Sequence, residues 1–347
     1  MASLPRRRLL IAAGALALAG CERRAKVVTT TPPPAATPPM DMKRLNRSIA
    51  AIAARVRPGV LGVGFSNLES GEAFTFNGDR PFPLQSVFKA PLAAAALAEV
   101  DAGRLSLDER VTLEPMDLSP PWSPIADAWP ARRDYSLGEL MTAAVATSDN
   151  TAADVLMARI GGPGAVTAWL NSKNIDAVRI DRYERELQTE LVGLSPFRPA
   201  WKGEAAFQAA RSTVPAARQR QALTVYLSDP RDTATPHGLL KFLGQLYAGA
   251  LISPASTRRL LQIMASGATA GGRIRAGLPE GSAVAQKTGT GPTVQGIVSA
   301  MNDAALVRLP DERRYSVAVF LAGATLAPSA CESAIAETTR ALIRGAR

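Results

Sequence analysis

Ser86 and Lys89 are the residues whose types and spacing first suggest chemistry. A serine alcohol becomes an effective nucleophile only when a nearby base takes its proton. Residues three apart are neighbours on a helix, so a helix that begins at Ser86 would place the Lys89 amine beside the hydroxyl. The N–H groups of that helix start would favour the negative charge of an attacking oxygen. Ser-x-x-Lys is common by chance, and a capping serine followed by a solvated lysine is the ordinary alternative.

Two further clusters could supply partners for this pair. Ser-Asp-Asn occupies residues 148–150, 62 positions after Ser86, and Lys-Thr-Gly occupies residues 287–289 at the end of a predicted strand. Ser, Asp and Asn also favour helix starts, so residues 148–150 alone could be a capping turn. A glycine in a strand lets a ligand lie close to the backbone. Taken together and in this order, the clusters form the signature of serine penicillin-recognising enzymes.

From about residue 60 to the C-terminus, the chain resembles a class A serine β-lactamase. The resemblance implies an α/β (α+β) fold of the β-lactamase/transpeptidase type. That fold has a five-stranded antiparallel sheet built from both chain ends, with flanking helices and an all-helical lobe. The resemblance also implies a hydrolase with a small-molecule β-lactam substrate and no cofactor or metal. Ser86 would attack the lactam carbonyl, and water activated by Glu184 would release the acyl group.

Site residues follow from the resemblance position by position. The catalytic positions would be Ser86, Lys89, Ser148 and Glu184, which lies 36 residues after Ser148. Ser148 would pass a proton to the lactam nitrogen, and either Lys89 or Glu184 could be the base in acylation. The backbone N–H groups of Ser86 and Thr290 would form the oxyanion hole. The substrate-binding positions would be Trp122, Asn150, Gln188, Arg273, Lys287, Thr288, Gly289 and Thr290. Core or interface packing remains the alternative for Trp122, and a solvated side chain remains the alternative for Arg273.

Two departures from the family pattern lie near Glu184. Gln188 stands where the family usually has Asn, and its longer arm could displace the hydrolytic water. Arg182 and Asp232, expected to pair and close the Ω-loop, are 50 residues apart. That separation is about 35 residues more than the family usually has, well beyond an ordinary loop. We predict that the enlarged region, residues 181–232, forms a partly helical flap beside the site; a tolerated surface excursion is the alternative.

Periodicity and turn residues predict the elements that would position these residues. Predicted strands cover residues 61–65, 73–77, 283–286, 298–308 and 315–322. Predicted helices cover residues 42–56, 86–100, 137–146, 152–160, 165–170, 238–247, 256–264 and 330–343. The strands lie at the two ends of the chain with helices between them, and the helical lobe is expected over residues 90–270.

The N-terminus predicts export. Three arginines at residues 6–8, an apolar run over residues 9–19 and small residues before Cys21 are typical of a lipoprotein signal peptide. We therefore predict a signal at residues 1–20, a Pro/Thr-rich tether at 21–41 and a catalytic domain at 42–347. Lipid on Cys21 would anchor a periplasmic monomer to a membrane, with an ordinary signal peptide as the alternative. Cys331 would then lack a disulfide partner.

Other function classes are less well supported. The net charge of +10 comes from scattered Lys and Arg residues, which favours general basicity over nucleic-acid binding. His237 is the only histidine and follows Pro236 at a predicted helix start, so we interpret it as structural. Two alternatives share the same first chemical step. One is a D-Ala-D-Ala carboxypeptidase or transpeptidase, and the other is a β-lactam-binding sensor lipoprotein that acylates without turnover.

Overall fold

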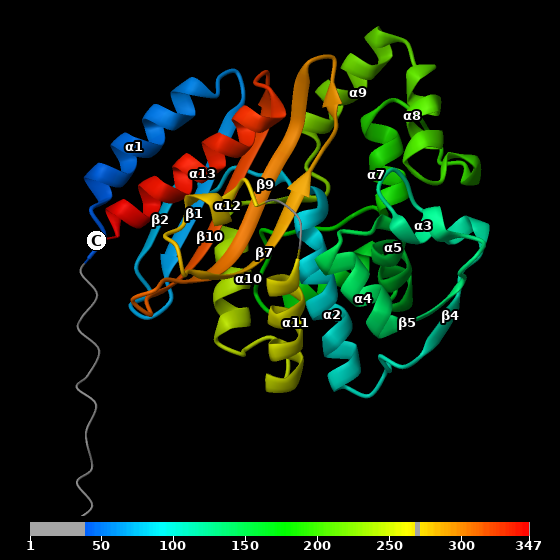
Figure 1. The fold of residues 1–347 in the computed structure, drawn as a ribbon, viewed down its shortest axis with the longest axis horizontal. Helices are drawn as coiled ribbons and strands as arrows, with labels where there is room; N and C mark the ends of the chain where they lie inside the picture. The colour runs from blue at the N-terminus through cyan, green and yellow to red at the C-terminus, as the bar shows by residue number, and fades with distance from the viewer. Residues whose placement is uncertain (1–38, 268–270, 347) are drawn as a thin grey trace, which may run out of the picture. The chain divides into compact units, whose positions relative to one another are not determined.

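A central antiparallel sheet joins the early and late parts of the chain (Figure 1). The computed structural model describes residues 39–267 and 271–346. β1 (Val60–Asn67) and β2 (Ala73–Phe76) pair with β7 (Ala283–Thr290), β9 (Ile297–Arg308) and β10 (Arg314–Ala324) in the order β2-β1-β10-β9-β7. The predicted antiparallel sheet from both chain ends is confirmed. The short β8 (Thr293–Val294), which also pairs with β9, was not predicted.

One face of the sheet is covered by α1 (Met42–Arg55) and α13 (Pro328–Gly345), which lie side by side in Figure 1. α1 turns Leu45, Ile49 and Ile52 inward, at the spacing that gives a helix one apolar side. These residues share a core with inward-facing sheet residues such as Phe65 and Val317. The two terminal helices are therefore part of one core rather than separate appendages.

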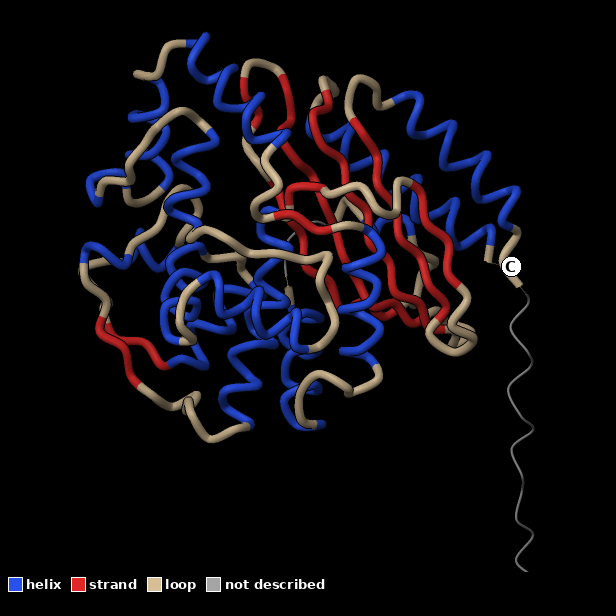
Figure 2. Tube along the Cα trace, turned by 180° about the vertical axis from the view of Figure 1, so that it is seen from behind, coloured by secondary structure: helices blue, strands red, loops and turns tan. Residues whose placement is uncertain are grey.

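The opposite face carries α10 (Pro236–Tyr247) and α11 (Pro254–Ser266), and α2 (Lys89–Asp101) packs against α11. Figure 2 shows the helices beyond them gathered as a lobe beside the strands. α2 is buried continuously from Lys89 to Leu97, because the sheet-side helices and the lobe enclose it. A helix that is apolar all round belongs in a protein interior. The residues at its start are consequently held between the two halves of the fold.

Short elements complete the helical lobe and its links to the sheet. α4 (Leu137–Ala146), α5 (Asn150–Arg159) and α6 (Pro163–Ser172) pack around α2. The observed helices differ from the predicted ones mainly at their starts, because Asp149 caps α5 and Pro163 occupies the first turn of α6. The remaining short elements are β3 (Phe82–Pro83), η1 (Gln85–Phe88), β4 (Arg110–Thr112), η2 (Pro115–Asp117), α3 (Pro124–Ala128), β5 (Asp134–Ser136), β6 (Thr233–Ala234) and α12 (Ile274–Gly277).

The enlarged region after Glu184 is mostly helical. It consists of α7 (Glu184–Leu191), η3 (Pro199–Trp201), α8 (Glu204–Ser212) and α9 (Ala216–Ser228). α7 and α9 share an apolar cluster with Val294 of β8. A second cluster, centred on Phe207, packs the connecting segment against α8. These clusters give the region an internal core of its own.

No helix within residues 39–267 and 271–346 is long and apolar enough to cross a membrane. The predicted signal peptide, most of the tether and Cys21 lie outside the described residues, so their interpretation stays a prediction. Cys331 is a buried free thiol on α13.

Candidate active site

Ser86 lies in η1, a 3-10 turn that runs directly into α2. Asn302 of β9 holds this turn by donating from Nδ2 to the carbonyls of Pro83 (2.7 Å) and Leu84 (3.0 Å). β7 also passes close to the turn, because a Cβ atom on Gly289 would lie 2.5 Å from the Leu84 carbonyl oxygen. Glycine at this position therefore permits the backbone of β7 to approach the segment that carries Ser86.

Lys89 is the first residue of α2 and is fully buried. Its Nζ donates to the Ser148 carbonyl (2.8 Å) and to Asn150 Oδ1 (2.5 Å), and it lies 3.1 Å from Glu184 Oε1. Three oxygens match the three donors of an ammonium group. Both members of the Lys89–Glu184 ion pair have no exposed side-chain surface, so each compensates a charge that would be costly to bury alone.

Glu184 begins α7 and faces the nucleophile. The Ser86 hydroxyl donates to Glu184 Oε1 over 3.4 Å, and Gln188 Nε2 donates to Glu184 Oε2 over 2.8 Å. Among the described residues, the Ser86 hydroxyl makes no hydrogen bond to Lys89. The acid and the alcohol therefore meet directly, with the amine beside the acid.

Asp154 of α5 fixes the position at which α7 starts. Its carboxylate accepts from the backbone N–H groups of Glu184 (2.7 Å) and Arg185 (3.2 Å) and from the Ser119 hydroxyl (2.6 Å). Complete burial raises the pKa of Asp154 to about 6, and the Ser119 hydrogen bond opposes that shift. No motif in the sequence marks this residue, so its role becomes visible only in the structure.

Ser148 lies where α4 ends and α5 begins, with a left-handed backbone (φ 62°). Lys287 of β7 donates from Nζ to Ser148 Oγ over 3.0 Å. Burial, followed by the nearby charge of Lys89, holds the pKa of Lys287 well below its usual value. A cation poised to release a proton thus contacts the Ser148 hydroxyl.

The neighbours of Ser148 connect the site to α3. Asp149 caps α5 through the Ala152 N–H and accepts from the Ile125 N–H of α3, both at 2.9 Å. Asn150 donates from Nδ2 to the Pro120 carbonyl (2.8 Å), and its N–H reaches the Trp122 carbonyl (3.0 Å). The Trp122 indole donates to the Thr147 carbonyl (2.8 Å), yet 53% of the residue is exposed at the cleft. Trp122 therefore lines the cleft as predicted and is not a core residue.

Arg273 lies on the opposite wall and is only 3% exposed. Its Nη2 donates to the Thr290 hydroxyl (2.6 Å), and its Nη1 donates to the carbonyls of Asn302 (2.9 Å) and Gly289 (3.2 Å). The guanidinium is therefore largely occupied by β7 and β9, and it reaches a ligand chiefly through Thr290. The solvated alternative for Arg273 is wrong.

These groups line a cleft of about 450 Å³. Predicted residues in its wall are Ser86, Trp122, Ser148, Asn150, Gln188, Arg273, Thr288 and Thr290. Lys89, Glu184 and Lys287 lie buried behind them and reach the cleft through the contacts described above. The structure thus brings the predicted residues together, and it leaves their roles to be tested. His237 lies elsewhere, on α10, bonded to Thr75 and Asp79.

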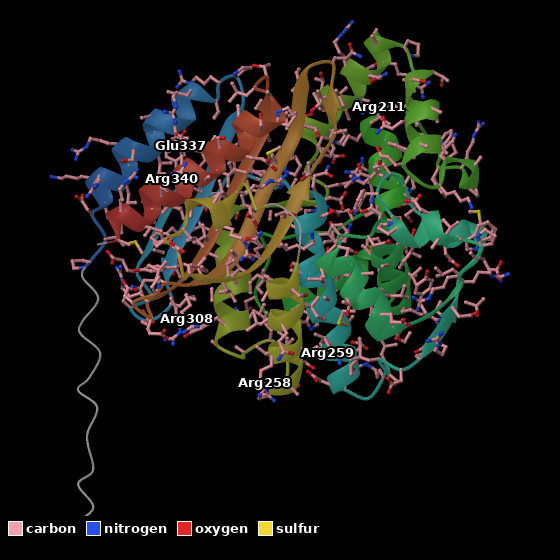
Figure 3. The ribbon with its side chains drawn as sticks, in the orientation of Figure 1. Arg211, Arg258, Arg259, Arg308, Glu337 and Arg340 are labelled. Carbon is pink, nitrogen blue, oxygen red and sulfur yellow. The ribbon has the colours of Figure 1, made fainter. Side chains whose placement is uncertain are left out.

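The enlarged region also contributes to the cleft wall. Glu204 and Gln208 of α8 line the cleft, which the sequence analysis did not identify. At one end of α8, Lys202 lies over the ring of Trp129, 3.9 Å from its centroid. At the other end, Arg211 (labelled in Figure 3) donates from Nη2 to the Thr293 carbonyl over 2.5 Å. α8 is therefore fastened to both the helical lobe and the sheet.

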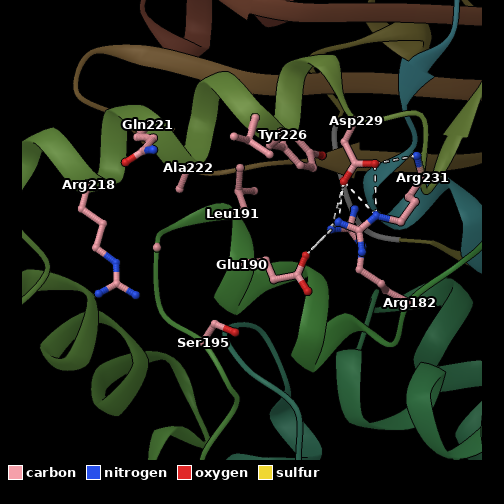
Figure 4. A pocket seen from close by; sticks show the side chains of 12 residues that line it. Arg182, Glu190, Leu191, Ser195, Arg218, Gln221, Ala222, Tyr226, Asp229 and Arg231 are labelled. Carbon is pink, nitrogen blue, oxygen red and sulfur yellow. Dashed lines mark hydrogen bonds and ion pairs between the residues drawn. The ribbon is translucent and has the colours of Figure 1, made fainter.

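Ion pairs close the enlarged region at its base. Arg182 Nε lies 2.6 Å from Asp232 Oδ2, so the predicted pair forms between residues 50 positions apart. Asp229, Glu190 and Arg231 extend the pair into a network, and Figure 4 draws its part formed by Arg182, Glu190, Asp229 and Arg231. The same residues line a second cavity of about 310 Å³ between α7 and α9. The network holds the ends of the region together.

Comparison with known proteins agrees with this geometry. The sequence model of the Beta-lactamase enzyme family matches residues 44–345, and the chain belongs to that family. Beta-lactamase VEB-1 of Pseudomonas aeruginosa is 29% identical over 265 residues, which are 76% of this chain and 77% of that protein.

Solved structures narrow the family to class A. The class A β-lactamase of the last common ancestor of Gram-negative bacteria is 34% identical to this chain. Its structure matches with a TM-score of 0.70 over 86% of this chain and 98% of that one. A β-lactamase from Chitinophaga pinensis is 30% identical, with a TM-score of 0.71, over 87% of this chain and 99% of that one. The predicted family, fold and enzyme class are thereby confirmed: this is a serine β-lactamase of class A.

Proposed function

We propose that the chain hydrolyses β-lactams through an acyl-enzyme on Ser86, released by water that Glu184 activates. One observation carries this assignment of roles. Glu184 Oε1 lies 3.4 Å from Ser86 Oγ and 3.1 Å from Lys89 Nζ, although the three residues come from distant segments. An alcohol and an amine that both contact one carboxylate oxygen are parts that acyl transfer needs.

Acylation begins when Ser86 Oγ attacks the lactam carbonyl carbon and its proton passes to the Glu184 carboxylate. The direct contact between the two side chains supports Glu184 as the proton acceptor. Lys89 balances the charge of the carboxylate beforehand. The backbone N–H groups of Ser86 and Thr290 hold the oxyanion, which the close approach of β7 to η1 favours.

Opening of the ring requires a proton at the lactam nitrogen. The Ser148 hydroxyl donates it as the C–N bond breaks, and Lys287 returns a proton to Ser148 through their 3.0 Å contact. The lowered pKa of Lys287 suits this transfer. Glu184 then releases its proton to solvent and Lys287 recovers one, so the site is ready for the second half-reaction.

Deacylation places a water between Glu184 and the acyl carbonyl. Glu184 takes a proton from the water as its oxygen attacks the carbonyl carbon, and Glu184 then returns this proton to Ser86 Oγ, which leaves as the alcohol. The product is the ring-opened acid. The substrate carboxylate lies towards Thr288 and Thr290, because Arg273 of the cleft wall contacts the Thr290 hydroxyl and the buried Lys287 directly precedes Thr288. The acylamino side chain points the other way, towards Asn150 and Gln188.

The experiment is turnover of a chromogenic cephalosporin by the purified protein. Multiple turnovers are expected. Glu184→Gln removes the proposed base of both half-reactions, so it should acylate slowly and then retain the adduct on Ser86, which intact-protein mass detects after long incubation. Glu186→Gln changes an exposed carboxylate two residues along the same helix and should retain turnover. A single stoichiometric burst from the unaltered protein would contradict the proposal and would favour the sensor or peptidase alternatives.

We propose further that the enzyme is a monomer held by lipid on Cys21 at the periplasmic side of the envelope. The basic and apolar N-terminal sequence before Cys21 supports the anchor. Cys21→Ser should move the protein from the membrane fraction to the soluble fraction, whereas Cys331→Ser, at the buried thiol, should not. Retention of Cys21→Ser in the membrane fraction would rule out the lipid.

A further inference from the structure

A chain of hydrogen bonds leads from Glu184 into the enlarged region. Gln188 Nε2 donates to Glu184 Oε2 (2.8 Å) and to Gln85 Oε1 (3.0 Å). Gln85 Nε2 in turn donates to the phenol oxygen of Tyr226 on α9. This chain of hydrogen bonds therefore joins the water-activating carboxylate, the residue before the nucleophile and a helix of the enlarged region.

Chemistry fixes the direction of every bond in this chain. An ionised carboxylate only accepts, so the Gln188 amide must turn its nitrogen towards Glu184. The second hydrogen of that nitrogen requires an acceptor, which is Gln85 Oε1, and the Gln85 nitrogen then faces Tyr226. Both hydrogens of Gln188 Nε2 are thus used, and Oε1 remains as the acceptor of this cleft-lining residue.

Burial makes the arrangement rigid. Gln85, Gln188 and Tyr226 are 1%, 5% and 5% exposed. Hydrogen bonds in such surroundings are stronger than in water, and an unpaired member is correspondingly costly. Burial also raises the pKa of Tyr226, so the phenol stays neutral. α9 itself is held against α7 by the cluster of Leu187, Leu191, Leu223 and Tyr226. Figure 4 shows Tyr226 on α9 facing Leu191 of α7.

We propose that Tyr226 is a positioning residue for deacylation, acting on Glu184 and the hydrolytic water through Gln85 and Gln188. The chain of hydrogen bonds fixes Oε2 of Glu184 and the orientation of the Gln188 amide, whereas Ser86 contacts Oε1 of Glu184. Without the phenol contact, the side-chain amides of Gln85 and Gln188 can rotate. The Gln188 oxygen that accepts from the hydrolytic water is then misplaced. Acylation depends instead on the Ser86–Glu184 contact and the oxyanion hole, so it is affected less.

The test is Tyr226→Phe, which removes only the hydroxyl, assayed by pre-steady-state kinetics with a penicillin. Deacylation should slow about 10- to 100-fold, as expected for small misplacements of reacting groups. The acylation rate constant should stay within about twofold, so kcat falls more than kcat/KM and the acyl-enzyme accumulates. Tyr315→Phe is the matched control: Tyr315 is a buried tyrosine that accepts from Arg313 (3.2 Å), and it packs in the core beneath α1 and α13. Its loss should leave both rate constants unchanged.

A second variant separates positioning from a general loss of folding. Gln85→Met cuts the same chain one bond closer to Glu184 and should give the same selective slowing. The double variant should be no slower than the slower single variant, because both remove one chain. Rates are normalised to the burst amplitude, which counts folded active sites.

Equal slowing of acylation and deacylation, additive effects in the double variant, or unchanged deacylation would each overturn the inference. The inference rests on the proposed function, and the two fail differently. If the unaltered protein turns over no β-lactam, the proposed function fails; if it does and Tyr226→Phe deacylates normally, only the role of Tyr226 fails.

Discussion

Glu184 shows how a single carboxylate can be both buried and reactive. Lys89 compensates the charge of Glu184, and Gln188 fixes one of its oxygens. Asp154 accepts from the backbone N–H of Glu184 and so holds the residue in position. Breaking a buried ion pair by removing one partner typically costs about 3–5 kcal/mol. The ion pair therefore acts on stability as well as on chemistry, and substitutions at Lys89 affect both.

Asp154 and Asp303 should make stability depend on pH. Burial raises the pKa of Asp154 to about 6 and that of Asp303 to about 7, from 3.8. The folded protein then holds these protons more tightly than the unfolded chain, so the free energy of unfolding falls as pH rises from about 4 to about 7. The fall from Asp154 ends near pH 6 and amounts to about 3 kcal/mol at most.

Asp154→Asn tests this at the residue concerned. The variant should lose part of the fall between pH 4 and 6 and keep the fall between pH 6 and 7, which belongs to Asp303. Urea unfolding at several pH values measures both slopes. Asp303→Asn is the reciprocal control and should flatten the upper interval. An unchanged slope in Asp154→Asn below pH 6 would contradict the assignment.

Sequence alone could identify the reacting residues but not the residues that hold them in position. Ser86, Lys89 and Lys287 belong to short motifs whose spacing is set by a helix turn or a strand. Gln85 and Tyr226 meet across 141 positions of chain, and Asp154 and Glu184 meet across 30. No local pattern encodes those contacts, because they depend on the path of the enlarged region.

At the scale of elements, α8 is the feature with the clearest bearing on specificity. It spans from Trp129 of the helical lobe to Thr293 of β8 and places Glu204 in the cleft wall. The predicted flap is thus a helix fastened at both ends, and its role in substrate access stays a prediction. The negative charge of Glu204 should attract or repel a charged group on the acylamino side chain of the substrate.

Glu204→Gln should change the order of preference among penicillins that differ only in that charge. Relative to a phenylacetyl penicillin, kcat/KM for the α-ammonium analogue should fall and kcat/KM for the α-carboxylate analogue should rise. Each change should be about two- to fivefold, since Glu204 is exposed and screened. Glu312→Gln, on the turn between β9 and β10, is the control. Identical ratios in both variants would remove α8 from substrate selection.

At the scale of the whole molecule, the terminal helices close the fold. The Asp41 N–H donates to the Gly345 carbonyl (2.9 Å), and Arg55 pairs with Glu337. A Cβ atom on Gly345 would lie 2.6 Å from Cγ of Leu45, which is fully buried. The junction between α1 and α13 is therefore packed without room for another carbon.

Gly345→Ala should lower the free energy of unfolding by about 1–3 kcal/mol, the usual cost of overpacking a core. Gly164→Ala places the same methyl on α6, where nothing lies within 4 Å, and should leave stability equal or slightly higher. Thermal unfolding of the two variants compares them directly. Equal melting temperatures would show that the junction between α1 and α13 can accommodate a methyl group at residue 345.

The fold was largely predictable because alternation and helical periodicity mark the long elements. The helix predicted over residues 137–146 has those bounds in the structure, and the strand predicted over residues 298–308 begins one residue earlier. β8, β3 and β6 are two residues each, too short for any periodicity, and only their partners define them. The region between Gln188 and Asp232 was predictable as extra length, but its three-dimensional course was not.

Gln85 lies between the nucleophile and α9, a helix of the enlarged region. A homologue without α9 has no phenol to complete the amide at that place, so a different type of side chain should precede its serine. Acquisition of the extra helices and of this glutamine should consequently be correlated along lines of descent, with neither inherited long without the other.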